Sequence, residues 1–453
     1  MALDPNSSPI GVVGLGLSGI AACHFLLQRG YRVLAWDQNP QRGAALASHP
    51  GLTLSHEFGP NTPLNRCQTI LLSPGIPRSH PALEHPLTQG IPVINDVEWL
   101  YQHNLRQACF ADFIGITGTN GKSTVTTLVG LMLAQSGFQT QTGGNLGQAA
   151  LSLWGDEVEK YVLELSSFQL ESLPSFRPQT ATLLNISPDH LDRYADFDDY
   201  LATKLQLFAH QQAGDQAVIN GDDALVMAAY EKMAGRGVVN LVPFSTQRAV
   251  PGGVYLQNRQ LIDHRGSKPQ PFLGVDQLKI TGIHNQANAL AAAATALCAG
   301  ASRQAVIETL SHFPGLAHRM EWIRTVNGIP YYNDSKGTNV GAVIQSLASF
   351  DTPLILIAGG RDKNSDFSPL VEPVAKRVSH LILLGEASSA LAAVLSGHCR
   401  IEQAQSMEQA VLLAHGRARP GETVLLSPAC ASFDMFKNFE ERGDLFRKAV
   451  HEL

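Results

Sequence analysis

At 453 residues the chain is too long for one ordinary core, and a typical size of about 100 to 200 residues per domain indicates three domains. A net charge of −6 without a Lys/Arg run argues against nucleic-acid and membrane-surface partners and favours small anionic ligands. The six cysteines form no C-x-x-C pair, no signal-peptide pattern precedes Ile10, and no apolar run reaches the roughly 20 residues that span a bilayer. We therefore expect a cytoplasmic protein with reduced thiols.

The first predicted domain, residues 1–103, opens with a Rossmann-like strand, turn and helix. The strand from Ile10 runs into Gly-x-Gly-x-x-Gly, and the next strand ends at Asp37. In this pattern the turn approaches a pyrophosphate and the acid is placed for a ribose hydroxyl. NAD and a UDP-sugar both carry these groups, so the motif fits either. The residues assigned to this ligand are Gly14, Leu15, Gly16, Ser18 and Asp37.

A second strand of this domain, beginning at Thr69, ends in the sequence Ser-Pro-Gly at 73–75. Ligands of open α/β sheets bind at the carboxyl edge of the strands, so Ser73 and Gly75 are candidates for the same ligand. A turn that serves only as a connection is the alternative. A linker-like stretch follows at 101–106.

The central predicted domain, residues 104–312, is organised around the sequence Phe-Ile-Gly-Ile-Thr-Gly-Thr-Asn-Gly-Lys-Ser-Thr at 113–124. An apolar strand here turns through glycines into a helix, whose first N–H groups and dipole form a cradle for phosphates. Lys122 is placed to reach the terminal phosphates of ATP, and the Ser123 hydroxyl to bind Mg²⁺. Ile116 stands where the common P-loop has its first glycine, and a Gly-rich turn with a solvated lysine is the alternative. The other residues assigned to ATP are Gly118, Thr119, Asn120, Gly121 and Thr124.

Three further residues of this domain are candidates for the same site. Glu164 ends an apolar strand, where a buried carboxylate is costly without a metal or a base. His190 follows another strand between two aspartates, and a neutral imidazole is a suitable second metal ligand. Asn145, in a glycine-rich turn, is placed to touch either ligand. A structural Glu and an ordinary hydrogen-bonded His are the alternatives.

Lys204 lies on the apolar stripe of a predicted helix over 197–208, since it is four residues after Tyr200 and four before Phe208. A lysine there either extends its ammonium to solvent or is disfavoured as a cation by burial and a nearby metal ion. The second case favours a neutral amine that captures carbon dioxide as a carbamate.

The third predicted domain, residues 313–453, alternates apolar strands with helical intervals, which indicates another mostly parallel, Rossmann-like sheet. Polar residues recur just beyond its strands, where a ligand is expected. They are Asp334, Lys336, Lys363 and Ser432, with Phe439 on the next helix. Before this domain, Asn285 opens an alanine-rich helix and is placed for a nucleotide base or ribose.

The loop at 113–124 resembles the ATP-binding loop of Mur ligases and folylpolyglutamate synthases, and further motifs over nearly the whole chain resemble the Mur ligase family. These motifs are Leu-Glu-Leu-Ser-Ser-Phe-Gln-Leu from 163, Asp-His-Leu-Asp-Arg-Tyr from 189, His-Asn at 284–285, Gly-Leu-x-His-Arg from 315, Asn-Asp-Ser-Lys from 333, Gly-Gly at 359–360 and Leu-Ser-Pro-Ala-Cys-Ala-Ser-Phe-Asp from 426. The resemblance implies three α/β domains: a Rossmann-like one for a UDP-sugar, a P-loop ATPase-like one for ATP and a Rossmann-like one for an amino acid.

The resemblance also implies roles for single residues. It assigns catalysis to Lys122, His190 and Lys204. It assigns the binding of Mg²⁺ to Ser123, Glu164, His190 and a carbamylated Lys204. The nucleotide further contacts Asn285, Arg319, Asp334 and Lys336, and the incoming amino acid contacts Thr338, Lys363, Ser432 and Phe439.

Within this family the C-terminal Ser-Pro-Ala-Cys-Ala-Ser block is typical of members that add D-glutamate to UDP-N-acetylmuramoyl-L-alanine through an acyl phosphate, and the Asp-Asn-Pro-Arg motif of diaminopimelate-adding members is absent. We expect that activity, in a monomer that synthesises peptidoglycan precursors. Another Mur ligase and a folylpolyglutamate synthase-like ligase are alternatives. A nicotinamide-dependent oxidoreductase would leave the ATP loop unexplained, and a nucleotide-gated binding protein would not need Glu164, His190 and Lys204 together.

Overall fold

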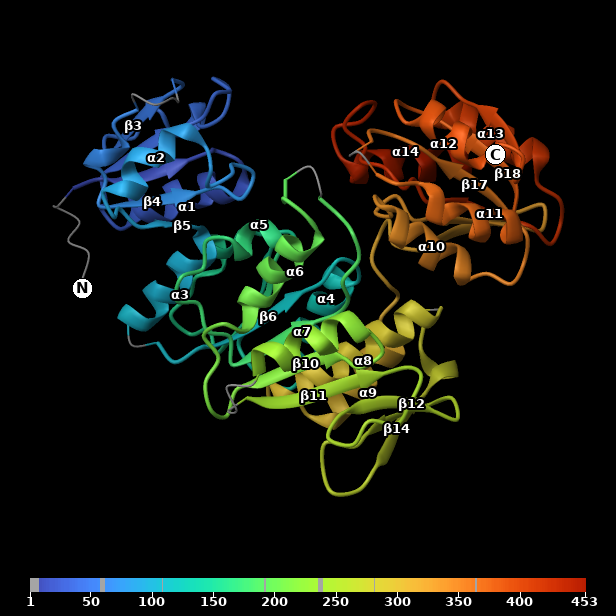
Figure 1. Cartoon of the computed structure of the whole chain (residues 1–453), viewed down its shortest axis with the longest axis horizontal. Coiled ribbons are helices and arrows are strands. Elements are labelled where there is room, and N and C mark those ends of the chain that lie inside the picture. Colours follow the sequence, from blue (N-terminus) through green and yellow to red (C-terminus); the bar gives the residue numbers. More distant parts are fainter. Residues whose placement is uncertain are drawn as a thin grey trace. The chain divides into compact units, whose positions relative to one another are not determined.

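The computed structural model describes residues 8–57, 62–107, 109–190, 193–234, 239–280, 282–362 and 365–453. It contains three β-sheets, one within each predicted domain, and helices connect most of their strands (Figure 1). The α/β class and the dominance of parallel strands are therefore as predicted. In the described part of the chain, no helix combines the length and the apolar character needed to cross a bilayer.

The first sheet has five parallel strands in the order β3-β2-β1-β4-β5. The chain leaves β1 in one direction and returns to its other side at β4, so the loops after β1 and β4 flank a topological switch point, where ligands of such sheets bind. Its strands and helices are β1 (Ile10–Val13), α1 (Leu17–Gln28), β2 (Val33–Trp36), β3 (Leu52–Ser55), β4 (Thr69–Leu72), α2 (Pro81–Thr88), β5 (Val93–Ile94) and α3 (Asp96–Arg106).

Helix α3 corrects one prediction, because the stretch expected to be a linker at 101–106 is the second half of this helix. Asn95 caps the helix by accepting a hydrogen bond from the backbone N–H of Glu98, and Asp96 and Glu98 add negative charge in the first turn. Trp99 and Leu100 are fully buried, so packing holds the helix in place.

The central sheet has nine strands in the order β14-β13-β12-β11-β10-β9-β6-β8-β7, parallel except where β12, β13 and β14 pair antiparallel. Strand β6 lies between β9 and β8, so the loop after β6 is flanked by the ends of both neighbours. The elements are β6 (Asp112–Thr117), α4 (Lys122–Gln135), β7 (Thr140–Gly144), β8 (Lys160–Glu164), α5 (Ser167–Leu170), β9 (Thr180–Leu183), α6 (Phe197–Leu205), β10 (Gln216–Asn220), α7 (Ala224–Ala234), β11 (Asn240–Ser245), β12 (Val254–Gln257), β13 (Gln260–Asp263), β14 (Gln270–Gly274), α8 (Ile283–Cys298) and α9 (Arg303–His312).

The third sheet has six strands in the order β15-β16-β20-β17-β18-β19, and only β15 is antiparallel to its neighbour. Because β20 lies between β16 and β17, the loops after these three strands meet at one edge. The elements are β15 (Glu321–Val326), β16 (Ile329–Asn333), α10 (Val340–Ala348), β17 (Leu354–Ala358), α11 (Val371–Arg377), β18 (Val378–Leu383), α12 (Ser388–Leu395), β19 (Arg400–Gln403), α13 (Met407–Arg417), β20 (Thr423–Leu426) and α14 (Phe439–His451).

The chain divides into two compact units, which we describe separately. The first comprises Met1–Ile186, Leu201–Gly274 and Asn288–Leu310 and holds the first two sheets. The second comprises Ser187–Tyr200, Val275–Ala287 and Ser311–Leu453 and holds the third sheet. Among the predicted site residues, His190 and Asn285 therefore belong to the second unit, together with those of the C-terminal domain.

Candidate functional site

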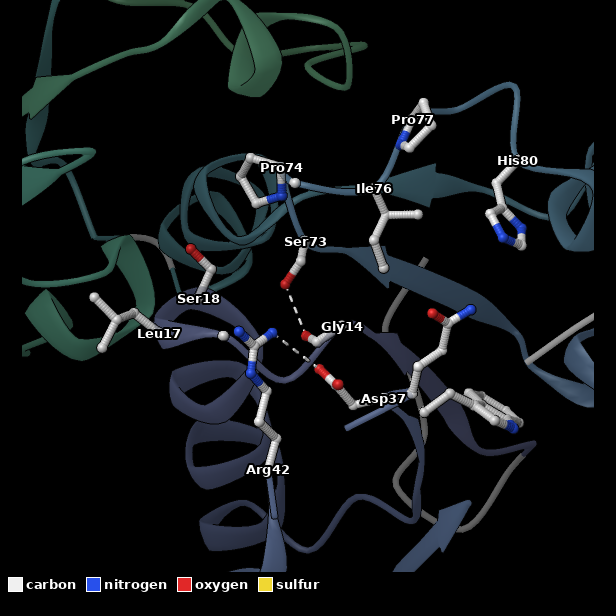
Figure 2. A pocket seen from close by; sticks show the side chains of 14 residues that line it. Gly14, Leu17, Ser18, Asp37, Arg42, Ser73, Pro74, Ile76, Pro77 and His80 are labelled. Atoms are coloured by element: carbon white, nitrogen blue, oxygen red, sulfur yellow. Dashed lines mark hydrogen bonds and ion pairs between the residues drawn. The ribbon is translucent and has the colours of Figure 1, made fainter. Parts of the chain in front are cut away.

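The loops after β1 and β4 border a cavity of about 480 Å³ (Figure 2). Of the residues predicted to bind the UDP-linked ligand, Gly14, Gly16, Ser18, Asp37, Ser73 and Gly75 line it. Leu15 and Asn145 were predicted for the same ligand but are not among the described residues that line the cavity. The sequence therefore located this cavity, although it did not predict which atoms hold the loops together.

Three hydrogen bonds hold the loops that border the cavity. The Ser73 hydroxyl donates to the Gly14 carbonyl oxygen at 2.7 Å and joins the two loops (Figure 2). The Asp37 carboxylate accepts hydrogen bonds from the backbone N–H of Leu15 at 2.6 Å and from that of Asn39 at 2.8 Å. Burial acts to raise the pKa of Asp37, but these N–H groups and the nearby Arg42 guanidinium outweigh burial and hold the pKa below its usual value.

The three glycines of this turn have different functions. A Cβ on Gly19 would lie 1.8 Å from the Gly14 carbonyl oxygen, so Gly19 allows α1 to pack against the turn. Gly14 has φ +87°, a conformation that disfavours other residues. A Cβ on Gly16 would meet no atom within 4 Å, so only open space adjoins this glycine. That space is what a pyrophosphate close to the backbone requires.

Ser18 lies close enough to the buried carboxylate of Asp96, in α3, to lower its pKa. Asp96 is 3% exposed and accepts the backbone N–H of Ala150, in the turn after β7, at 3.2 Å. Burial raises the pKa of Asp96. Sequence reasoning missed this carboxylate, because the partners of a buried acid that are distant in sequence leave no local pattern.

The loop between β6 and α4 brings together the residues predicted to bind ATP and metal within the first unit. The Ser123 hydroxyl donates to one carboxylate oxygen of Glu164 at 2.5 Å, and the Asn145 amide donates to the other at 2.7 Å. Glu164 is 2% exposed. Hydroxyl, carboxylate and amide oxygens are the donors that Mg²⁺ prefers, so this set fits a magnesium ion completed by phosphate oxygens and water.

The two lysines predicted for catalysis reach the same carbonyl group. Lys122 Nζ donates to the carbonyl oxygens of Gly118 and Thr119 at 2.9 and 2.8 Å, and Lys204 Nζ donates to that of Gly118 at 3.0 Å. Lys204 is 2% exposed, so the alternative in which it extends to solvent is wrong. Its position on the apolar stripe of α6 therefore brings a buried amine to the phosphate loop.

Asn185, which sequence reasoning missed, fixes the other side of the loop. Its side-chain oxygen accepts the backbone N–H of Asn120 at 2.8 Å, and its amide donates to the Asn120 carbonyl oxygen at 3.0 Å. The only sequence feature that could have indicated Asn185 is its position just after β9, the strand next to β6. Thr124 is buried in the first turn of α4, and a Cβ on Gly121 would lie 2.3 Å from the Asn288 side-chain oxygen.

In the second unit, His190 has a left-handed backbone with φ 56°, and its Nε2 lies 3.7 Å from Asp189 Oδ2. Asp189 also accepts a hydrogen bond from the Asn339 amide at 3.3 Å. Asn339 caps α10 and follows Thr338, which is predicted to contact the incoming amino acid. The segment carrying His190 is therefore joined to the loop after β16.

The loops after β16 and β20 gather most of the predicted C-terminal residues. Lys336 Nζ lies 3.7 Å from the centre of the Phe439 ring, so residues predicted for two different ligands are in contact. Asp334 accepts hydrogen bonds from the hydroxyls of Ser346 and Ser427, and burial raises its pKa to about 6. Arg319 lies close enough to act on this pKa in the opposite direction.

Arg442 holds these loops together, and sequence reasoning missed it. The guanidinium is 1% exposed and donates to the Ser335 hydroxyl and carbonyl and to the carbonyls of Cys430 and Ala431. Burial lowers its pKa to about 10. Ser432, the residue after Ala431, is 2% exposed. Lys363 lies outside the described residues, so its predicted role has no structural description.

Comparison with known proteins assigns the family. The chain matches the Mur ligase MurD-like N-terminal domain over residues 8–95, the Mur ligase middle domain over 116–296 and the Mur ligase glutamate ligase domain over 318–430. A protein of Geotalea uraniireducens named UDP-N-acetylmuramoylalanine--D-glutamate ligase is 41% identical, covering 98% of this chain and 97% of the relative. One of the same name from Geobacter sp. is 40% identical and covers 99% and 98%.

Solved structures agree on the fold. A pseudomurein peptide ligase type C from Methanothermus fervidus has a TM-score of 0.63 at 17% identity, covering 98% of this chain and 100% of the other. The MurF ligase from Thermotoga maritima in complex with ADP has a TM-score of 0.61 at 15% identity, covering 100% and 97%. Three matched domains and relatives about 40% identical over nearly the whole chain show that this protein belongs to the Mur ligase family.

Proposed function

We propose that this protein is an ATP-dependent ligase that joins D-glutamate to UDP-N-acetylmuramoyl-L-alanine in the synthesis of peptidoglycan precursors. The observation that carries the proposal is the 41% identity over 98% of the chain to a relative named for this reaction. The two phosphate-binding loops of the first unit supply a separate site for each nucleotide, which a one-nucleotide oxidoreductase does not need.

The chemistry explains why two such loops are useful. A carboxylate and an ammonium group do not condense in water, because the carboxylate oxygen is a poor leaving group. Transfer of the terminal phosphate of ATP to the carboxylate gives an acyl phosphate and ADP. Attack by the neutral amine of D-glutamate then forms a tetrahedral intermediate, from which phosphate leaves as the amide forms. The protein has to hold both reactants in line and keep water away from the acyl phosphate.

Lys122 would turn from the loop carbonyls to the transferring phosphate and balance its charge. The backbone N–H groups at the start of α4 would bind the remaining phosphate oxygens. Asn285, Arg319, Asp334 and Lys336 would complete the ATP site. D-Glutamate would contact Thr338, Lys363, Ser432 and Phe439, with Lys363 as the partner of a carboxylate.

The donor set of Ser123, Glu164 and Asn145 supports a magnesium site, with His190 and Lys204 as the further predicted ligands. When bound, Mg²⁺ would neutralise phosphate charge during transfer. Glu164 and Ser123 would hold the ion through oxygen atoms, and Asn145 would keep the carboxylate oriented.

Burial of Lys204 supports its predicted carbamylation. An ammonium enclosed at 2% exposure beside a metal site is disfavoured both by loss of water and by like charge. A neutral amine adds carbon dioxide and loses a proton, and the resulting carbamate is an anion that suits the metal side of the loop. We further propose a cytoplasmic monomer that acts on these small molecules only.

The test is a turnover assay with ATP, Mg²⁺, UDP-N-acetylmuramoyl-L-alanine and a panel of amino acids, in which ADP and product mass are followed. We expect ADP release to require both the UDP-linked acid and D-glutamate, with L-glutamate much weaker. Comparable turnover with L-alanine, L-lysine or diaminopimelate would overturn the assignment of the amino acid. Tight NAD binding that the UDP-sugar does not displace would favour the oxidoreductase.

A further inference from the structure

The cavity beside the first loop has an unusual balance of charge for a site that receives a diphosphate. Among the described residues that line it, Arg42 is the only Lys or Arg and Asp37 is the only Asp or Glu. Their charges cancel, so the lining has no net charge while both are present. Without the guanidinium it would carry one negative charge and repel a phosphate anion.

Asp37 leaves most of Arg42 available. Its carboxylate is already bonded to two backbone N–H groups at 2.6 and 2.8 Å, whereas Arg42 Nη1 lies 3.5 Å from Oδ2. A guanidinium has five N–H donors in a planar fork, and this contact occupies one of them at the long end of hydrogen-bonding distance. The Arg42 side chain is 55% exposed, and in Figure 2 its guanidinium points into the cavity beside Asp37.

The loop itself does not supply a full positive charge. Leu15 is one of the residues predicted to bind the ligand, but its backbone N–H is bonded to Asp37. Helix α1 begins at the loop with no side-chain acceptor at its Gly16 cap and no acid in its first turn, but the carboxylate of Asp37 already accepts the Leu15 N–H just before this end. That end is equivalent to roughly half a charge, which is less than a diphosphate carries.

We propose that Arg42 is a specificity-determining residue of the UDP site: its guanidinium binds the diphosphate of the UDP-linked substrate and selects this anion over an uncharged nucleoside. The inference rests on the proposed function for the identity of the substrate. Asp37 holds the guanidinium beside the open space at Gly16, and the phosphate oxygens complete the hydrogen bonds that Asp37 leaves unused.

The experiment compares binding of UDP and of uridine to the full-length protein by titration calorimetry. The variants are Arg42→Ala, Arg42→Gln and Arg42→Lys, and the control is Arg66→Ala, which removes an exposed arginine of the same domain that is not among the cavity-lining residues. For Arg42→Ala we expect UDP affinity to fall by about tenfold to a hundredfold, the usual effect of losing a charged hydrogen bond, with uridine affinity unchanged. Arg42→Lys should fall between, because lysine keeps the charge and loses the fork.

Equal losses for UDP and uridine would overturn the proposal, since Arg42 would then act on the base, the ribose or the fold. No loss of UDP affinity beyond that of Arg66→Ala would also overturn it and leave Arg42 as a partner of Asp37 only. In turnover assays of Arg42→Ala, KM for the UDP-linked acid should rise, while KM for D-glutamate and kcat should stay constant. If the wild type does not make the amide, the proposed function fails, and the UDP and uridine titrations still decide the role of Arg42.

Discussion

The first unit contains two loops of the same local design, one after β1 and one after β6. Each follows a strand inside a parallel sheet and leads into a helix whose first residue is preceded by a glycine cap with no side-chain acceptor. They differ in what surrounds them. Beside the first loop a carboxylate is bonded to backbone N–H groups, with one cation at the rim, whereas beside the second two lysines, a hydroxyl and a carboxylate converge on a few atoms.

Under the proposed function, this difference corresponds to a first loop that binds a phosphate group and a second loop that takes part in its transfer. The backbone gives both loops an anion site, because helix N–H groups and close-packed glycines are sufficient for that. Transfer also needs charge that can follow the phosphate as it moves, and two lysines, Lys122 and Lys204, lie at the second loop beside the pair of Ser123 and Glu164. The predictions below test that division.

The largest expected effect is on Lys122. Replacing it with Met should lower kcat by about a hundredfold to a thousandfold, since a charged donor to the transferring phosphate is lost. UDP affinity should stay unchanged, because the first loop is untouched. Steady-state turnover and UDP calorimetry measure the two quantities, with the exposed Lys268→Met as the matched control. Turnover close to that of the control would mean that the second loop does not depend on this cation.

Lys204 tests whether the second loop depends on a modified side chain. We expect Lys204→Ala to lose about a hundredfold in kcat, with partial recovery when a short carboxylic acid is added, because formate or acetate can occupy the vacated anion position. Activity of the wild type should fall in buffer depleted of carbon dioxide, and the Lys122 variant should show no recovery with the acids. Near-normal turnover of Lys204→Ala would exclude the carbamate.

Gly16 in the first loop and Gly121 in the second should respond differently to replacement by alanine. Gly16→Ala adds a methyl group where no atom lies within 4 Å and φ is −73°, so the thermal midpoint should not change. The methyl group would occupy the space for the diphosphate, and KM for the UDP-linked acid should rise by about tenfold. Gly121→Ala should instead destabilise the protein by about 1 to 3 kcal/mol, because φ is +84° and the Cβ would meet Asn288. Equal midpoints for the two variants would contradict this reasoning.

Two carboxylates make stability depend on pH in opposite directions. Backbone N–H groups keep the pKa of Asp37 low, so its contribution to stability is present above pH 4 and is lost only on further acidification. Burial raises the pKa of Asp334 from 3.8 to about 6, so the contribution of this group to stability is full below pH 4 and is lost as pH rises through 6, by up to about 3 kcal/mol. Asp334→Asn should remove that decrease in unfolding midpoints measured from pH 4 to pH 7. An unchanged pH profile in the variant would contradict a buried, titrating Asp334.

Sequence reasoning predicted the parts of the molecule that depend on local pattern. The phosphate loops, the end of β8 at Glu164 and the buried stripe of α6 follow from strand and helix periodicity, and the structure has each of them in the expected element. The contact between Ser123 and Glu164 follows from strand order, because β8 is next to β6.

The residues that sequence reasoning missed depend on partners far along the chain. Asn185 contacts Asn120 across 65 positions, and Arg442 contacts Ser335 across 107. A polar residue near a strand end or on a helix does not reveal such a partner. The polar composition of residues 101–106 predicts a linker, but the polar side chains of His103 and Asn104 are buried in α3 while Leu105 is exposed, so no apolar pattern marks this half of the helix.

The buried carboxylate of Asp96 has a consequence for building chimeric ligases. It accepts the Ala150 N–H, in the turn that follows Asn145, and Ser18, at the start of α1, lies close enough to lower its pKa. A chimera that takes the UDP loop from one parent and α3 from another would place a foreign residue 18 beside the buried acid, and a residue without a hydroxyl would remove one of the groups that favour the charged carboxylate. Residues 18, 96 and 150 should therefore come from a single parent, wherever the crossover is placed.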